Sequence, residues 1–140
     1  MDRTKIYIGI DPGTHTGVAV YNPREMRLTD IRTLPLHTAL RFVENYSQIP
    51  AVELVVCFED ARLRKWFGRT GREQLQGAGS IKRDSAIWEE FLTDLGIGFE
   101  KIAPRNNCTN LSAEQFRRIT GYEGRVSEHG RDAAMLVFGR

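Results

Sequence analysis

The first third of the chain carries apolar runs separated by short polar turns, a pattern that predicts β-strands. The runs at residues 5–10 and 17–21 have apolar side chains on both faces, which indicates central strands covered from both sides. The connection between them, P12-G-T-H-T-G17, is short, so we predict an antiparallel hairpin. Residues 26–33 alternate only in part and are typical of a third strand nearer the edge of a sheet.

From residue 38 onward the pattern predicts helices that alternate with strands. Ser112 and Gln115 have the spacing of a capping box, and Ser127 is a suitable N-cap for the last helix. Gly96 is a plausible stop for the longest helix. In chain order the expected elements are a helix over 38–46, a strand over 54–58, a helix over 73–95, a strand over 97–102, and helices over 112–119 and 127–138.

This order of elements predicts an α/β fold. The first three strands should form an antiparallel meander, and the two later strands, each reached through a helix, should add in parallel. The result is a five-stranded mixed sheet flanked by helices on both faces. At 140 residues, the chain is expected to form a single domain over residues 1–140.

Composition changes this picture little. The hydrophobic fraction of 41% is that of an ordinary globular domain, and no apolar run approaches the roughly 18 residues of a membrane span. The N-terminal residues lack the apolar region of a secretory signal, so we expect a cytoplasmic protein without a membrane partner. Cys57 and Cys108 are too far apart in sequence for a metal-binding pair, and Cys57 is expected to be a buried free thiol.

The charge is distributed unevenly. Residues 62–83 carry seven basic side chains against one acid, a net charge of +6, whereas the whole chain carries +2. A concentrated basic segment on a mildly acidic body suggests a polyanionic partner that is met at one place. A solvated loop without a partner is the alternative.

Acidic residues stand where two predicted central strands end. Asp11 follows the first strand and Glu59 the fourth, while His129 and Asp132 lie three residues apart and share a face of the last helix. Carboxylates that converge repel one another, and a divalent cation removes the conflict. An oxygen-rich ligand set suits Mg²⁺ or Mn²⁺. Two such ions about 4 Å apart can activate water and stabilise a leaving oxygen in phosphodiester hydrolysis.

Each of these residues also has an ordinary structural interpretation. Asp11 precedes Pro and Gly and could be a turn residue, and Glu59 could be solvated or paired with a following arginine. His129 and Asp132 could be polar residues in the first turn of a surface helix. Asp60 points to the other side if its strand continues, and it is expected to bind no metal.

Three stretches together resemble a known family. I8-G-I-D-P-G-T-H-T-G-V-A-V20 resembles the opening of RuvC-type Holliday junction resolvases, members of the ribonuclease H-like superfamily. V55-V-C-F-E59 resembles the strand that delivers the catalytic glutamate of that family, and H129-G-R-D-A-A134 resembles its last helix. The resemblance implies a ribonuclease H-like fold and a homodimeric, Mg²⁺-dependent endonuclease with two metal ions per site. Such an enzyme cuts opposed strands of a four-way DNA junction symmetrically.

By the same resemblance, Asp11, Glu59 and Asp132 are metal ligands, and His129 either binds metal or handles protons for the attacking water. The residues expected to bind DNA are basic or aromatic and follow Glu59: Arg62, Arg64, Lys65, Trp66, Phe67, Arg69, Arg72, Lys82 and Arg83. The family usually carries an aromatic wedge sooner after its glutamate. Here Trp66 and Phe67 could stack on bases from a longer loop, or instead form a dimer or core contact.

Other functions remain open at the level of sequence. The opening motif also resembles the YqgF-type group, so RNA processing or cleavage of an RNA–DNA hybrid would use the same metal ligands. An actin-like or sugar-kinase domain opens with a similar Asp-x-Gly-Thr turn, but it needs a second domain for which 140 residues leave no room. A module that binds junctions without cutting them is the remaining alternative, and the presence of all four candidate ligands weighs against it.

Overall fold

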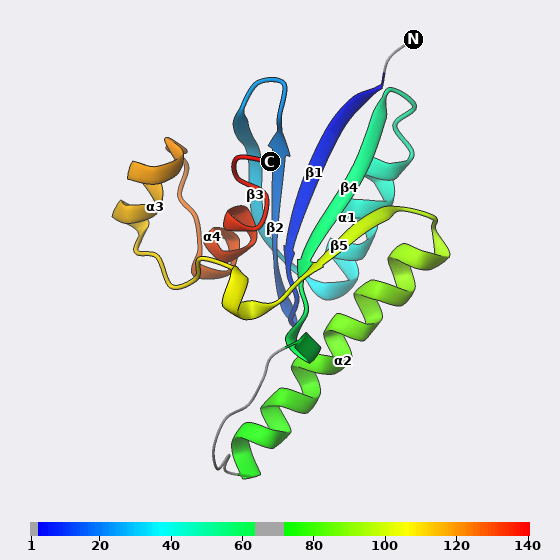
Figure 1. The fold of residues 1–140 in the computed structure, drawn as a ribbon, viewed down its shortest axis with the longest axis vertical. Coiled ribbons are helices and arrows are strands. Elements are labelled where there is room, and N and C mark those ends of the chain that lie inside the picture. The colour runs from blue at the N-terminus through cyan, green and yellow to red at the C-terminus, as the bar shows by residue number, and fades with distance from the viewer. Residues whose placement is uncertain (1–2, 64–71) are drawn as a thin grey trace.

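The computed structural model describes residues 3–63 and 72–140, and for residues 72–78 it describes only the course of the backbone. Regular elements follow one another in the predicted order, with two short 3-10 turns added (Figure 1). They are β1 (Thr4–Asp11), β2 (His15–Asn22), β3 (Arg27–Pro35), α1 (Leu36–Ser47), β4 (Val52–Glu59), η1 (Ala61–Leu63), α2 (Arg72–Asp94), β5 (Gly98–Ile102), η2 (Pro104–Asn106), α3 (Ala113–Thr120) and α4 (Glu128–Met135).

The strands form one mixed sheet in the order β3-β2-β1-β4-β5. β1 pairs antiparallel with β2, and β2 pairs antiparallel with β3, whereas β4 lies parallel to β1 and β5 parallel to β4. The predicted sheet, with three antiparallel strands followed by two parallel ones, is confirmed. In the parallel pair Ile10 of β1 stands beside Phe58 of β4, so the next residues of the two strands, Asp11 and Glu59, reach the same edge of the sheet.

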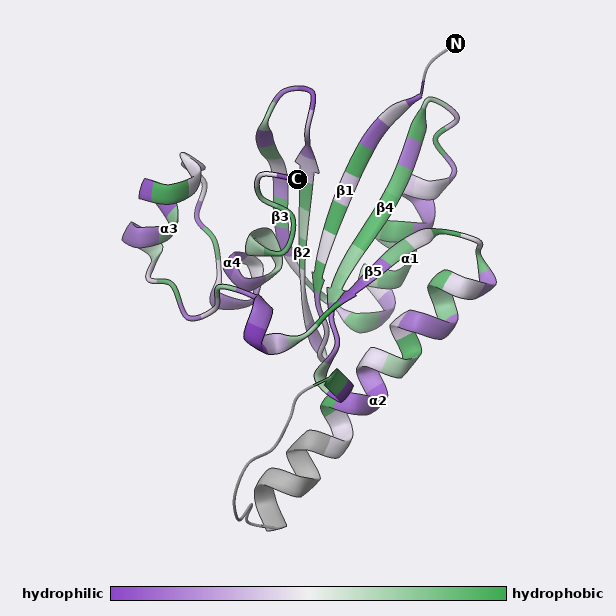
Figure 2. Ribbon diagram, viewed as in Figure 1, coloured by the Kyte–Doolittle hydropathy of each residue, from purple (hydrophilic) through white to green (hydrophobic). Residues whose placement is uncertain are grey.

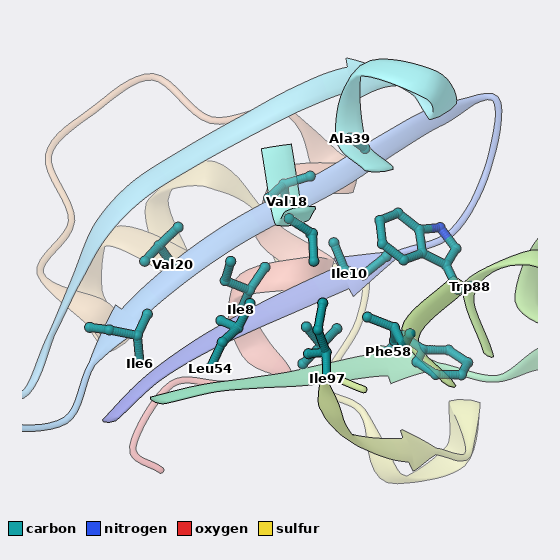
Figure 3. Close-up of a cluster of buried hydrophobic side chains, with 13 residues drawn as sticks. Ile6, Ile8, Ile10, Val18, Val20, Ala39, Leu54, Phe58, Trp88 and Ile97 are labelled. Carbon is teal, nitrogen blue, oxygen red and sulfur yellow. The ribbon is translucent and has the colours of Figure 1, made fainter. Parts of the chain in front are cut away.

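One face of the sheet packs against α1 and α2. Isoleucines and valines of β1, β2 and β4 form its core with Ala39 and Val43 of α1 and with Trp88 and Leu92 of α2. Figure 3 shows the Trp88 ring beside Ile10, near the end of the strand that carries Asp11. Each buried side chain of this size contributes about 1.5–3 kcal/mol of transfer free energy, so this core fixes the strand ends firmly.

The opposite face packs against α4, and α3 packs on α4. α4 approaches the sheet backbone closely because Gly9 of β1 has no side chain: a Cβ atom there would overlap the carbonyl oxygen of Ala133. Cys57 is buried in this second core as a free thiol, as predicted, and burial raises its pKa to about 11. The sequence pattern of small residues in α4, Ala133 and Ala134, is thus explained by close packing on the sheet.

The last helix differs from its prediction. We expected it over 127–138, but α4 ends at Met135, and the chain continues in turns through residue 139. The backbone N–H groups of Leu136 and Val137 donate to carbonyls three residues back, those of Ala133 and Ala134, so the chain tightens into turns after Met135. The apolar pattern predicted a longer helix because Leu136 and Val137 are buried, but in the structure these residues lie in a turn.

α2 is the longest helix and extends beyond the end of the sheet, on the side where β1 and β4 end (Figure 1). In the coloured part of α2 in Figure 2, hydrophobic and hydrophilic positions alternate, as expected for a helix with one face on a sheet. Within residues 3–63 and 72–140, no helix combines the length and the apolar character required to cross a bilayer.

Candidate functional site

The site begins where β1 and β4 end. Asp11 is the last residue of β1 and Glu59 the last of β4, and both are half-buried. The turn that follows Asp11 is held by Thr16, which is fully buried and whose hydroxyl donates to the carbonyl of Gly13 at 2.7 Å. Parallel pairing and this fixed turn together bring the two carboxylates to one edge of the sheet.

Helix α4 brings the third stretch to the same edge. Ser127 caps the helix by accepting the N–H of Gly130 at 3.1 Å, and its hydroxyl also bonds that of Thr33 in β3. Gly17 of β2 lies directly under the first turn, since a Cβ atom there would overlap the carbonyl oxygen of His129. His129 is therefore positioned over the end of β1, where its Nδ1 lies 3.1 Å from Oδ2 of Asp11.

Asp132, one turn further along α4, completes the set of predicted residues. Its Oδ1 accepts the backbone N–H of Asn110 at 3.2 Å. Asn107 connects it to Glu59, because the Nδ2 group donates both to Oε2 of Glu59 and to the backbone carbonyl of Asp132, each at 3.1 Å. The sequence prediction missed Asn107 and Asn110. Their only signal was a run of asparagines after β5, which by itself indicates nothing more than a turn.

The electrostatics of the site reflect this convergence. The pKa of Asp11 is raised to about 6, by burial first and then by the negative charges of Glu59 and Asp132, while the hydrogen bond with His129 acts against them. The pKa of Asp132 is also raised, first by burial and then by the charge of Glu128, against the opposing effect of the Asn110 N–H. Ionised carboxylates that raise one another's pKa would be stabilised by a cation.

The donor set fits a hard divalent cation, since carboxylate oxygens are the preferred ligands of Mg²⁺ and Mn²⁺. As the side chains stand, no three His, Cys, Asp or Glu side chains in the described part of the chain are close enough together to ligate one ion. The residues instead form two linked pairs, Asp11 with His129 and Glu59 with Asp132 through Asn107. Ligation of one cation by three of these side chains therefore requires a change from this arrangement.

The predicted DNA-binding residues fall into three groups. Lys82 and Arg83 are exposed on α2. Arg62 has a structural role: it holds Asp60 with two hydrogen bonds, Nε to Oδ1 at 2.8 Å and Nη2 to Oδ2 at 2.7 Å, and it donates to Glu89 at 2.9 Å. The remaining predicted residues lie outside the described residues, Arg72 by its side chain and the others entirely: Arg64, Lys65, Trp66, Phe67 and Arg69.

Comparison with known proteins gives similarity to solved structures but none by sequence. No protein-family model matches the chain, and no curated protein matches it by sequence. Among solved structures, RuvC of T. thermophilus in complex with a Holliday junction substrate is similar with a TM-score of 0.60 and 20% sequence identity. The similarity covers 94% of this chain and 89% of that one. At this identity it shows the fold alone: the chain has a ribonuclease H-like fold similar to that of RuvC, as predicted from its sequence.

Proposed function

We propose that the protein is a metal-dependent endonuclease that resolves four-way DNA junctions as a homodimer. The observation that carries the proposal is the approach of Asp11, Glu59 and Asp132 from three distant stretches, close enough for the latter two to raise the pKa of Asp11. A purely structural site would pair these charges with lysine or arginine. The partner found on Asp11 is instead His129, whose side chain is 55% exposed.

Asp11, Glu59, Asp132 and His129 are the residues that would hold Mg²⁺ or Mn²⁺, two ions per site. When bound, the ions would supply an activated water and stabilise the leaving oxygen of a phosphodiester. Other residues of the chain would position the ligands and hold protons. Asn110 orients Asp132 through its backbone N–H, and His129 can hold a proton at Nδ1 beside Asp11.

Branched DNA is the proposed substrate on two grounds. The RuvC structure of the same fold is bound to a Holliday junction. In this chain the basic segment 62–83 follows Glu59 directly, so phosphates near the cut would meet Lys82, Arg83 and the basic residues before them. Symmetric cleavage of two opposed strands requires two sites, which is the reason for proposing a dimer.

The test is cleavage of three substrates by the purified protein: a synthetic four-way junction, a matched linear duplex and an RNA–DNA hybrid, each with Mg²⁺ and with chelator. We expect paired, symmetric nicks in the junction alone, and only with Mg²⁺. The variant Asp11→Asn should lose cleavage while junction binding stays largely intact, because a ligand is removed and the basic segment is not.

Other results would redirect the proposal. Cleavage of the hybrid in place of the junction would move the protein to a different nuclease class within the same fold. Tight junction binding without cutting would indicate a binding module. Full cleavage by Asp11→Asn in Mg²⁺ would refute the site assignment itself.

A further inference from the structure

The segment between β5 and α3 touches two of the three candidate carboxylates. Asn107 donates to Glu59, and the backbone N–H of Asn110 donates to Asp132. The 107–110 segment begins directly after η2, where the Asn107 N–H bonds the carbonyl of Pro104 at 3.2 Å. It thus starts from a fixed point after β5 and runs beside α4 to α3 (Figure 1).

Two features of this segment are unfavourable for folding. Asn110 has φ of 62°, in the left-handed region that asparagine tolerates better than most residues but still at some cost. The Oδ1 atom of Asn107 is buried and has no hydrogen-bond partner among the described residues. A buried acceptor without a partner is destabilising, so its presence in a folded protein requires an explanation.

The orientation of the Asn107 side-chain amide is determined by the two oxygen atoms that accept hydrogen bonds from it. The Nδ2 group donates hydrogen bonds to Oε2 of Glu59 and to the carbonyl oxygen of Asp132, and both of these oxygens can only accept. If the amide were turned round, its own oxygen would face these two oxygens without a hydrogen atom between them. The amide therefore joins the end of β4 to helix α4, at the cost of leaving its own oxygen unsatisfied.

We propose that Asn107 is a positioning residue of the metal site, one that holds the Glu59 carboxylate in place relative to the helix that carries Asp132. This inference rests on the proposed function, because it assumes that the carboxylates bind a cation. Groups that hydrogen-bond a metal ligand orient it, and removing one typically weakens metal affinity by about 10–100-fold. A loop residue that serves only the fold would have no such effect.

The experiment is calorimetric titration of Mn²⁺ into the wild-type protein, Asn107→Ala and Asn106→Ala, with urea unfolding of each in chelator. Asn106 is the matched control, because it is the neighbouring asparagine and its side chain is exposed. We expect Asn107→Ala to bind Mn²⁺ at least about tenfold more weakly. Its urea midpoint should stay near that of the wild type, since the variant removes an unsatisfied acceptor together with the donor. Asn106→Ala should match the wild type in both measurements.

The outcomes separate this inference from the function on which it rests. If the wild type binds Mn²⁺ and Asn107→Ala binds it equally well, Asn107 has no positioning role and the proposed function stands. If the wild type binds no Mn²⁺, the proposed function fails and this inference with it. If Asn107→Ala does not fold, Asn107→Leu, which has similar volume and no polar atoms, decides the question by the same tenfold criterion.

Discussion

Glu59 and Asp60 are neighbours in the chain, yet their carboxylates lie in opposite electrostatic surroundings. Asp60 is 1% exposed and is held by Arg62, which also bonds Glu89 of α2, and Glu89 in turn accepts from Lys101 of β5 at 3.0 Å. Glu59 receives only the neutral amide of Asn107 among the described hydrogen bonds and faces the region of Asp11 and Asp132.

The pKa values follow the same division. Burial raises the pKa of Asp60, but the hydrogen bonds and charge of Arg62 outweigh it, and the net pKa is lowered. The pKa of Glu89 is lowered by Lys101 and then by Arg62. In contrast, the pKa values of Asp11 and Asp132 are raised. The Asp60 network contains its own cations, Arg62 and Lys101, whereas no lysine or arginine of the described residues forms an ion pair with Asp11, Glu59 or Asp132, which agrees with the cation site proposed for them.

The largest effect is expected from neutralising Glu59, the neighbour of Asp60 that belongs to the proposed cation site. Glu59→Gln should reduce junction cleavage by at least about 10³-fold, or roughly 4 kcal/mol in the barrier, while the free energy of unfolding stays near that of the wild type. Single-turnover cleavage and urea unfolding measure the two quantities. A stability loss as large as the activity loss would mean that Glu59, like Asp60, serves the fold.

Breaking the Asp60 network should lower the free energy of unfolding. Arg62→Ala leaves the buried Asp60 without its cation and is expected to cost about 3 kcal/mol of unfolding free energy, since an uncompensated buried charge remains. Arg118→Ala is the control, because its pair with Glu114 is exposed on both sides and is worth about 0.3–0.5 kcal/mol. Equal effects of the two variants in urea unfolding would contradict a structural role for Arg62.

The pH dependence of stability sharpens the comparison. Asp11 has a pKa of about 6 in the folded protein against 3.8 ordinarily, so the folded state binds this proton more tightly. In chelator, stability from this group should therefore rise as pH falls from about 7 to 4, by up to ~3 kcal/mol. The raised pKa of Asp132 acts in the same direction.

Asp11→Asn removes most of this dependence and should be more stable than the wild type at pH 7, with the difference vanishing near pH 4. Below that, the lowered pKa of Asp60 acts in the opposite direction and stability falls for both proteins. Urea unfolding across this range checks the prediction, and parallel curves for the two proteins would contradict the raised pKa of Asp11.

The smallest effect is expected on the exposed basic residues of α2. Replacing Lys82 and Arg83 together by alanine should weaken junction binding and lower the slope of log affinity against log salt by up to about 2, one counterion per lost phosphate contact. Arg27→Ala, at the opposite end of the sheet, is the control, because it removes one exposed positive charge away from the proposed site. If both variants retain the wild-type slope, α2 does not contact phosphates.

The sequence predicted the sheet well because strands give local signals, whereas the role of the four candidate ligands stays a prediction. Apolar runs show where strands lie, and Asp11 and Glu59 stand directly at the ends of two of them. The three-residue spacing of His129 and Asp132 placed both on one face of the last helix, and the resemblance to RuvC-type proteins added their expected role as metal ligands. Because Gly17 has no side chain, the first turn of α4 can pack closely on β2 and bring His129 to Asp11. This contact depends on the packing of α4 on the sheet.

The contacts that the sequence did not predict are long-range and lack periodicity. Arg62 was expected to contact DNA, but its partner Glu89 lies 27 residues further along and becomes adjacent only when α2 packs beside η1. Asn107 reaches Glu59 across 48 residues from a segment without regular structure. No local pattern records either contact, because each depends on how two separate elements meet.

The central claim is that Asp11, Glu59 and Asp132 form a cation site while the neighbouring Asp60 network does not. Hydroxyl-radical cleavage of the protein backbone by Fe²⁺ with ascorbate and peroxide tests it most directly, because radicals cut the chain next to the bound metal. We predict fragments ending near residues 11, 59 and 129–132 that disappear with excess Mg²⁺ and in Asp11→Asn. Fragments concentrated near Asp60 and Glu89, or cleavage spread evenly along the chain, would contradict the account.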